Sequence, residues 1–255
     1  MEKLFEYYIE NDLIHVKYAK GMPARRDTEF HDYSEFVYFI NGNSFFISKN
    51  LQQKLSSKSV IMIPQENYHQ FVVRDAENYT RCILGFRKSS EIGRLADEVM
   101  SGIKIISQPD KSITDIFDGL AEIMASNFND DDKLIFAKAS LMQLLVRIKQ
   151  NAPDIRDSVP DTLVSRAIDI IDARYSEKLS VDLLAGLLYV SPSTLSHKFK
   201  EELNISVYRY VTKKRLSAAH GMISQGESIT SASTKCGFSD YSCFYRLYKK
   251  YYGNI

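Results

Sequence analysis

The sequence predicts an α+β protein in which a strand-rich N-terminal region is followed by helices. Residues 13–87 hold short runs rich in Val, Ile, Phe and Tyr, separated by turn-forming segments such as Asn41-Gly42-Asn43. From about residue 88 the apolar residues recur at helical spacing instead. A chain of 255 residues, 44% hydrophobic and 25% charged, is long enough to bury two cores, so we expect two domains.

Several short strands are predicted in the first region. Many strands at this spacing are typical of a small sandwich or barrel. The predicted strands are Leu13–Tyr18, Phe36–Ile40, Ser44–Ser48, Ser59–Ile63 and Tyr79–Phe86.

Two amphipathic helices follow, over residues 113–128 and 134–148, on either side of the acidic turn Asp130-Asp131-Asp132. The pair can pack on the strand-rich domain or present an apolar stripe to a second subunit, and the sequence favours packing within the chain. Residues 151–160 contain two prolines and no periodicity, which indicates a linker. Residues 161–255 are predicted to be helical throughout.

The C-terminal third contains an internal repeat. Shifting the sequence by 49 residues places Leu195–Lys200 on Phe244–Lys249, with one residue more in the turn of the second copy. Each copy predicts a helix, a tight turn and a second helix, which is the helix-turn-helix unit. Ser191 is the expected N-cap of the second helix in the first copy, and Ser239 or Asp240 in the second.

The second helix of each copy has an apolar face and a polar face on a helical wheel. Leu195, Phe199 and Leu203 form the expected core face in the first copy, as do Phe244 and Tyr248 in the second. The polar faces could be ordinary solvated surfaces, but their recurrence in one register favours DNA binding, since such side chains bond base edges and phosphates. The candidate DNA-binding residues are Ser193, Ser196, His197, Lys200, Ser242, Tyr245, Arg246 and Lys249.

A single long helix is predicted between the copies, from Val207 to Gln225, with Ser206 as its N-cap. Its length of about 28 Å is close to the rise of one DNA turn, about 34 Å, so both second helices could enter successive major-groove segments. Arg215 falls within the apolar face of this helix, and we expect it to have an acidic partner.

These residues resemble the signature of the AraC/XylS family of bacterial transcription regulators. The resemblance rests on Cys236–Arg246, followed by Tyr248-Lys249-Lys250 and Gly253, and on Tyr189–Lys200 for the first helix-turn-helix. It implies two recognition helices on one asymmetric DNA site, usually upstream of a promoter, with activation through RNA polymerase.

The N-terminal region in turn resembles the cupin-like sensor domains of many such regulators, which implies a β-barrel with polar side chains near its mouth. The matching segments are Glu29-x-His31-x3-Glu35-x6-Gly42 and Pro64-x4-His69.

Two carboxylates and two imidazoles at these spacings could bind a divalent metal. However, Glu29 stands where a cupin metal site normally has His, and Glu66 replaces a Gly of the motif. The resemblance therefore implies a small polar effector, such as a sugar, bound without a metal or another cofactor, and a structural network without any ligand is the alternative. The candidate effector-binding residues are Glu29, His31, Glu35 and His69.

Composition excludes other classes of protein. Three cysteines without a Cys-x-x-Cys motif predict neither a disulfide framework nor a cysteine-ligated zinc site. There is no signal core and no apolar stretch long enough to cross a bilayer, so we expect a cytoplasmic protein. Residues 161–255 carry 13 basic and 9 acidic side chains against 20 and 23 in residues 1–160, which favours nucleic acid as the partner of the C-terminal third.

The sequence therefore predicts a DNA-binding transcription regulator that responds to a small-molecule effector. We expect it to activate transcription and to have no enzymatic activity. Its expected partners are double-stranded DNA, RNA polymerase, the effector and a second copy of the chain. The alternatives are a metal-dependent cupin enzyme with a helical appendage and a sensor on which another protein docks. The predicted parts are an effector-sensing domain (1–87), a helical dimerisation or relay region (88–150), a linker (151–160) and a DNA-binding domain with two helix-turn-helix motifs (161–255).

Overall fold

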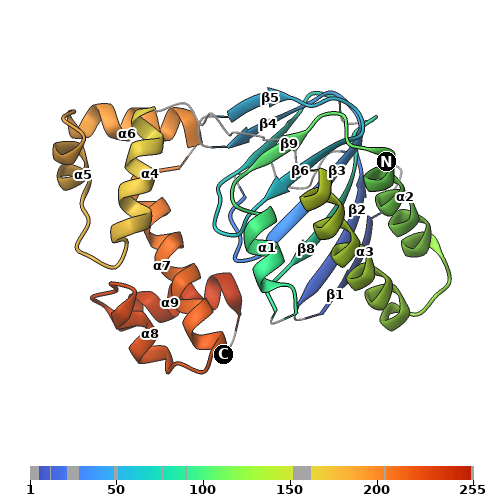
Figure 1. The fold of residues 1–255 in the computed structure, drawn as a ribbon. Helices are drawn as coiled ribbons and strands as arrows, with labels where there is room; N and C mark the ends of the chain where they lie inside the picture. The colour runs from blue at the N-terminus through green and yellow to red at the C-terminus, as the bar shows by residue number, and fades with distance from the viewer. Residues whose placement is uncertain are drawn as a thin grey trace. The chain divides into compact units, whose positions relative to one another are not determined.

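The computed structural model describes residues 6–11, 13–21, 29–48, 51–75, 77–89, 91–151, 162–203 and 205–253. The chain divides into two compact units, residues 1–47 with 51–158 and residues 159–255 with 48–50. Strands and three helices form the first unit, and the second is helical, so the predicted α+β class is confirmed (Figure 1). Most of the predicted linker, from residue 152 to residue 160, lies outside the described residues.

The first unit contains two sheets. The larger sheet has six antiparallel strands in the order β1-β2-β8-β3-β6-β9, and the smaller has three in the order β5-β4-β7. Over the described part of the chain these sheets are separate and do not form the closed barrel that the resemblance implies. The strands are β1 (Glu6–Glu10), β2 (Ile14–Lys20), β3 (Ser34–Asn41), β4 (Ser44–Ser48), β5 (Leu51–Lys54), β6 (Ser59–Ile63), β7 (Gln70–Val73), β8 (Thr80–Phe86) and β9 (Lys104–Ile106).

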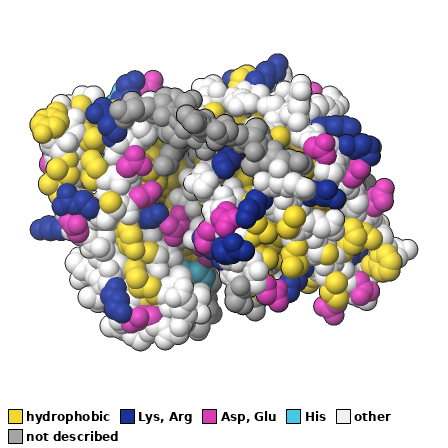
Figure 2. All heavy atoms as spheres, viewed as in Figure 1, with side chains coloured by type: hydrophobic (Ala, Val, Ile, Leu, Met, Phe, Trp, Pro, Cys, Tyr) yellow, Lys and Arg dark blue, Asp and Glu magenta, His cyan; other side chains and the backbone are white. Residues whose placement is uncertain are grey.

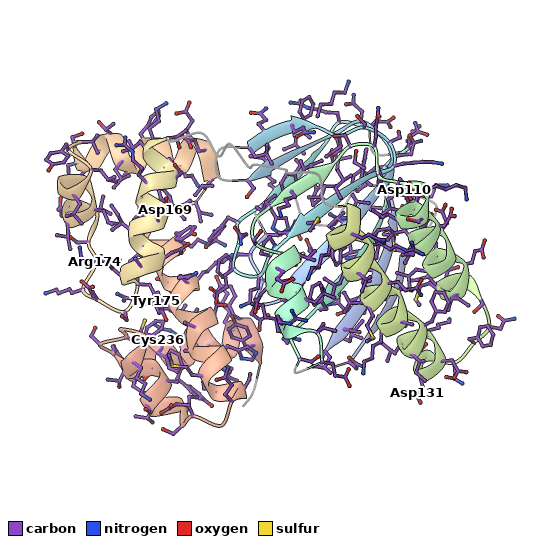
Figure 3. All side chains as sticks on the ribbon, in the orientation of Figure 1. Asp110, Asp131, Asp169, Arg174, Tyr175 and Cys236 are labelled. Carbon is purple, nitrogen blue, oxygen red and sulfur yellow. The ribbon has the colours of Figure 1, made fainter. Side chains whose placement is uncertain are left out.

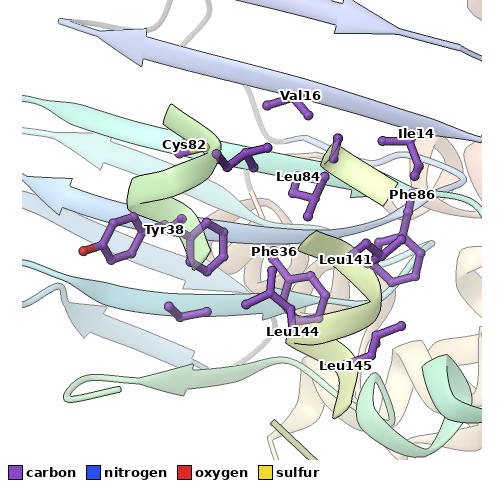
Figure 4. Packing of buried hydrophobic residues seen from close by; sticks show 14 of the residues in the cluster. Ile14, Val16, Phe36, Tyr38, Cys82, Leu84, Phe86, Leu141, Leu144 and Leu145 are labelled. Atoms are coloured by element: carbon purple, nitrogen blue, oxygen red, sulfur yellow. The ribbon is translucent and has the colours of Figure 1, made fainter. Parts of the chain in front are cut away.

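The larger sheet is buried on both faces, so its central strands are apolar at nearly every position. Alternate residues of β3 point to opposite sides: Phe36 and Tyr38 pack with the helices (Figure 4), and Val37 and Phe39 pack toward the smaller sheet. Five predicted strands match β2, β3, β4, β6 and β8 within two residues at each end, whereas β1, β5, β7 and β9 were not predicted.

Three helices cover the outer face of the larger sheet: α1 (Gly93–Val99), α2 (Lys111–Ala125) and α3 (Asp130–Asn151). The carboxylate of Asp110 (Figure 3) accepts a hydrogen bond from the backbone N–H of Ser112, which satisfies an otherwise unpaired donor at the start of α2. Phe117 of α2 stacks on Tyr38 with 4.9 Å between ring centroids. The two predicted helices therefore pack within the chain, as the sequence favoured.

The second unit consists of six described helices. Ser206 caps the long helix α7 as predicted, through a 3.2 Å hydrogen bond from the N–H of Arg209. None of the described helices of either unit is both long and apolar enough to cross a membrane. The helices are α4 (Leu163–Arg174), α5 (Val181–Leu187), α6 (Pro192–Leu203), α7 (Val207–Ser224), α8 (Ile229–Lys235) and α9 (Tyr241–Tyr252).

Arg215 of α7 is bound differently from the expectation. Its Nε donates to the carbonyl oxygen of Tyr175 and its NH2 donates to that of Glu177, both at 2.7 Å, just beyond the last turn of α4. Tyr175, labelled in Figure 3, is the C-cap of that helix. The end of a helix carries partial negative charge, so main-chain oxygens supply what an acidic side chain was expected to supply.

Candidate nucleic-acid interface and candidate effector site

The first helix pair, α5 and α6, is joined by a tight turn. Tyr189 directly follows the C-cap of α5 and has φ 58°, in the left-handed region. The N–H of Val190 donates to the carbonyl oxygen of Ala185 at 3.0 Å, which closes the end of α5. Ser191 then accepts from the N–H of Thr194 at 3.1 Å and starts α6, as predicted.

The second helix pair, α8 and α9, repeats this arrangement with different residues. Gly237 follows the C-cap of α8 with φ 83°, and the N–H of Phe238 donates to the carbonyl oxygen of Ser233 at 3.1 Å. Asp240 caps α9 by accepting from the N–H of Cys243 at 3.0 Å, which decides between the two predicted caps. The extra residue of the second copy lies between the left-handed residue and the cap.

Both second helices bury the faces that the sequence assigned to the core. Leu195 and Phe199 of α6 and Phe244 of α9 are fully buried, and Tyr248 of α9 is nearly so. The candidate DNA-binding side chains lie on the exposed faces: Ser193, Ser196, His197 and Lys200 on α6, and Ser242, Tyr245, Arg246 and Lys249 on α9.

The two exposed faces differ in charge. On α6, Lys198 forms an ion pair with Glu201 at 2.9 Å, and Glu202 follows it. On α9, Arg246, Lys249 and Lys250 occur without any acidic side chain. Helix α9 therefore presents the more positive surface, and we expect it to attract phosphates more strongly.

An aromatic contact that sequence reasoning missed holds α9 against α7. The His220 Nδ1 lies 2.7 Å from the Tyr248 hydroxyl, and the imidazole stacks on Tyr252 with 4.0 Å between ring centroids. No motif indicates this contact, because His220 lies in the long helix and its partners lie about 30 residues later. The contact joins α9 to α7 beside their shared apolar core.

The second candidate site lies in the first unit, where residues 29–35 meet residues 64–69. Glu29 and His69 pair as an isolated bridge, with backbone hydrogen bonds of 2.7 and 3.1 Å. The N–H of Glu66 donates to the carbonyl oxygen of His31 at 2.8 Å. Glu66 has φ 63°, so it adopts at this position the left-handed conformation that the glycine of the cupin motif adopts without steric cost.

These backbone contacts bring the four candidate effector-binding side chains together. Oε1 of Glu35 lies 3.4 Å from Nε2 of His31 and 3.2 Å from Nε2 of His69, and Oε2 of Glu29 lies 3.7 Å from the same His69 atom. Glu35 and His69 are almost completely buried, whereas the Glu29 side chain is 37% exposed. Glu29 therefore lies on the solvent side of the cluster.

The charges in the cluster depend on one another. Burial by itself raises the pKa of Glu35, but the imidazoles of His31 and His69 outweigh it and hold that pKa well below the usual range. Burial likewise lowers the pKa of His69, but the carboxylates of Glu29 and Glu35 raise it to about 9. Without a ligand the cluster is therefore a buried ion pair at neutral pH.

Sequence reasoning missed a buried cation beside this cluster. Arg81 of β8 has a 4% exposed side chain, its NH2 lies 3.9 Å from Oε1 of Glu29, and its guanidinium lies 4.9 Å from the centroid of the Phe71 ring. His15 of β2 also borders the cluster through Tyr33, whose ring stacks on His31 at 3.9 Å. These residues reach the site by strand pairing, which no local sequence pattern reveals.

The cluster also contains the kinds of ligand atom that bind a divalent metal ion. One donor atom from each of His31, Glu35 and His69 lies within 4.8 Å of the other two. These buried atoms make no hydrogen bond with another group. Two imidazoles and one carboxylate are ligands that zinc and related transition metals accept.

Comparison with known proteins decides the class of the molecule. A family model described as a helix-turn-helix domain matches residues 184–255. The HTH-type transcriptional activator RhaS of Escherichia fergusonii is 22% identical over 233 residues, which cover 88% of this chain and 83% of that protein. The chain is a DNA-binding transcription regulator, and its similarities are to regulators of the AraC/XylS type.

Two further similarities cover different shares of this regulator. The xylose operon regulatory protein of Haemophilus influenzae is 29% identical over 102 residues, 40% of this chain and 26% of that protein. A crystal structure of apo ToxT from Vibrio cholerae aligns over 94% of both chains with 12% identity and a TM-score of 0.43. The similarity to RhaS therefore extends over most of this chain, whereas the similarity to the xylose regulator covers less than half of it.

Proposed function

We propose that this regulator binds a specific double-stranded DNA site with α6 and α9 as recognition helices and activates transcription in response to a small-molecule effector. The observation that carries the proposal is the repeated helix pair. Both pairs have a left-handed residue at the equivalent turn position, Tyr189 or Gly237, and an equivalent closing hydrogen bond, and both present a polar face opposite a buried one. Two such units supply two helix-turn-helix motifs.

The long helix α7 separates the two recognition helices. Its 18 residues give a length of about 27 Å, near the rise of one DNA turn of about 34 Å. The two helices can then read successive major-groove segments on one side of the duplex. The site would consist of two short blocks about 10 base pairs apart.

Individual side chains take different parts in this proposal. Arg246 carries a planar guanidinium that can bond both acceptors of a guanine, and losing that contact costs about 1–3 kcal/mol. Lys200 binds phosphate, so its loss weakens binding to every sequence and flattens the salt dependence. The hydroxyls of Ser193, Ser196, Ser242 and Tyr245, together with His197 and Lys249, complete the polar faces.

Selection of bound duplexes from a random DNA library tests this function. The full chain, Arg246→Ala and Arg94→Ala are compared at moderate salt; Arg94 lies on α1 and its side chain is 86% exposed. We expect two enriched blocks for the wild type and for Arg94→Ala, and the loss of one block for Arg246→Ala. If Arg246→Ala weakened binding to all sequences equally, Arg246 would be a phosphate contact instead of a base contact. No enrichment, with or without cell extract as a source of effector, would refute the function.

The regulator is also proposed to act as a homodimer through α3. Ile135, Ala139, Met142 and Val146 are exposed and fall within about 60° of one helical wheel. Figure 2 shows hydrophobic side chains on the surface over α2 and α3. A groove of about 350 Å³ adjoins the stripe and is lined in part by Leu13, Ile135 and Met142.

The order of residues along α3 fits a second copy in antiparallel orientation. In that pairing Ile135 faces Val146 and Ala139 faces Met142 of the other copy. The acidic start of each helix then meets the basic end of the other, with Asp132 opposite Lys149, which also pairs with Glu98 of its own chain. Such an interface is self-complementary, as a two-fold axis requires.

Sedimentation equilibrium of the full chain tests the dimer. We expect Val146→Asp to produce monomers, because it places a charge in the middle of the apolar contact. Gln143→Asp adds the same charge to the same helix about 70° from the centre of the stripe and is expected to leave the dimer intact. A wild-type monomer at micromolar concentration, or equal behaviour of the two variants, contradicts the α3 interface.

In this proposal residues 1–87 sense the effector, residues 88–150 dimerise and relay, residues 151–160 connect, and residues 161–255 bind DNA. The effector binds around Glu29, His31, Glu35 and His69, and it acts only by favouring one arrangement of the DNA-binding parts over another. The activator names of the relatives support activation, for which RNA polymerase is the proposed partner. A reporter gene behind the selected site measures the sign of regulation, and repression would contradict this part.

A further inference from the structure

We propose that His31, Glu35 and His69 bind one divalent transition-metal ion per chain, with Glu29 as an exchangeable fourth ligand on the solvent side. This deepens the proposed function, because it names a chemical component of the effector site. It replaces the expectation of a metal-free site, which rested on Glu29 at a histidine position, on Glu66 in place of a glycine of the motif, and on the resemblance to regulators that bind effectors without a metal. A glutamate is itself a metal ligand.

The orientation of the two imidazoles is the first argument. Nδ1 of His31 lies 2.6 Å from the carbonyl oxygen of Tyr33, and Nδ1 of His69 lies 3.1 Å from that of Asn67. A carbonyl oxygen only accepts hydrogen bonds, so each Nδ1 carries the proton. A metal ion would displace the proton from Nε2, and both Nε2 lone pairs would then point toward Glu35, as second-shell hydrogen bonds at Nδ1 orient histidine ligands.

The separations between the donor atoms are the second argument. A metal with bonds of about 2.0–2.1 Å in tetrahedral geometry keeps its ligand atoms about 3.3 Å apart. Oε1 of Glu35 lies 3.4 Å from one Nε2 and 3.2 Å from the other. The three atoms lie within 4.8 Å of one another, so closing them onto an ion requires a movement of about 1 Å or less.

Burial is the third argument. Nε2 of His31, Oε1 of Glu35 and Nε2 of His69 are all buried, and the two imidazoles share one carboxylate oxygen at 3.2–3.4 Å without well-formed hydrogen bonds. Buried polar atoms need well-formed partners, and these three atoms converge on one point. An ion bound at that point gives each of them a direct bond.

Glu29 lies on the solvent side of the site, with Arg81 beside it. The Glu29 carboxylate lies 3.7 Å from Nε2 of His69 through Oε2 and 3.9 Å from NH2 of Arg81 through Oε1. One oxygen can thus reach the ion while the other stays beside the guanidinium. Because Glu29 is 37% exposed, a ligand arriving from solvent can displace it. Imidazole donors favour Zn²⁺ and Co²⁺ over Mg²⁺, which prefers oxygen ligands.

Metal content and titration of the full chain, without an affinity tag, test the site. The protein is stripped with EDTA, titrated calorimetrically with Zn²⁺, Co²⁺ and Mg²⁺, and analysed by mass spectrometry for bound metal. We expect one Zn²⁺ or Co²⁺ per chain and no binding of Mg²⁺. Glu35→Gln and His69→Gln should each weaken Zn²⁺ binding by about 100-fold or more, since even second-shell changes cost 10- to 100-fold.

Glu122→Gln is the matched control, because it removes an exposed carboxylate from α2 of the same unit. The proposal is overturned if the wild type binds neither ion, or if Glu35→Gln and His69→Gln bind as the wild type does, as surface sites would. Circular dichroism shows whether the variants fold. If they do not, the visible spectrum of Co²⁺ in the wild type decides, and bands of aqueous cobalt alone refute the site. DNA selection in EDTA is scored separately, so failure of the metal site and failure of DNA binding are distinguishable.

Discussion

Replacing Gly237 with alanine perturbs the turn between α8 and α9 in two ways. The residue has φ 83°, a conformation that costs an L side chain about 1–2 kcal/mol. The added Cβ would also lie 2.3 Å from the carbonyl oxygen of Ser176 and 2.8 Å from its carbonyl carbon. These are backbone atoms that no rotamer change can move away. Relieving such a clash costs about 1–3 kcal/mol, so the sum is about 2–5 kcal/mol.

Gly226 provides a matched control at the end of α7. Its φ of 93° carries a similar conformational cost, but an added Cβ there would meet no atom within 4 Å. We therefore expect Gly226→Ala to destabilise the second unit by about 1–2 kcal/mol only. The difference between the two variants, about 1–3 kcal/mol, isolates the contact with Ser176.

Hydrogen exchange followed by mass spectrometry measures both variants unit by unit. Peptides from α9 should exchange about 30- to 4,000-fold faster in Gly237→Ala than in the wild type, at about 1.4 kcal/mol per tenfold. Peptides from β8 in the first unit serve as the internal reference and should not change. Equal effects of the two substitutions on α9 would refute the argument, because the close approach of Ser176 would then contribute nothing.

Three further substitutions test other contacts, each by the same exchange measurement. Tyr189→Gly should stabilise α5 and α6 by up to about 1 kcal/mol, because the side chain is 96% exposed and its φ of 58° favours glycine; a loss of protection contradicts this. Arg215→Met should destabilise α4 by about 2–4 kcal/mol through the loss of two charged hydrogen bonds, and an unchanged α4 contradicts that account. Gly85→Ala should destabilise the first unit by about 1–3 kcal/mol, since the added Cβ would lie 1.9 Å from the His15 ring. Unchanged hydrogen exchange in the β2 and β8 peptides would show that the ring moves away freely.

The helical elements were the easiest to predict from sequence, because each depends on nearby residues. Ser191 and Ser206 cap helices within three residues of their own position, and the apolar stripe of α6 recurs at helical spacing. Strands β5 and β7 were missed because each has only four residues and is half exposed, so their pattern is weak. Strand β9 has three residues and is a strand only through its pairing with β6.

The sequence predicted the motif residues of the candidate effector site. It did not predict the residues that other strands place beside them. Glu29, His31, Glu35 and His69 were found because their spacing matches a motif, and the structure brings all four together. Arg81 was not found, because it lies 52 positions after Glu29 in the sequence and reaches it through the order of strands in the sheet. Strand order and register are set by long-range packing, which a single sequence does not display.

The two turns of the second unit show why equivalent positions carry such different residues. Tyr189 and Gly237 both follow a helix C-cap and both have positive φ, so the backbone makes the same demand at each. At Tyr189 the side chain extends into solvent, and the chain sustains a modest conformational cost without a steric one. At Gly237 the carbonyl of Ser176 occupies the space of a Cβ, so only glycine fits. The glycine of the second copy is therefore required by its contact with the segment after α4, and the turn shape alone does not require it.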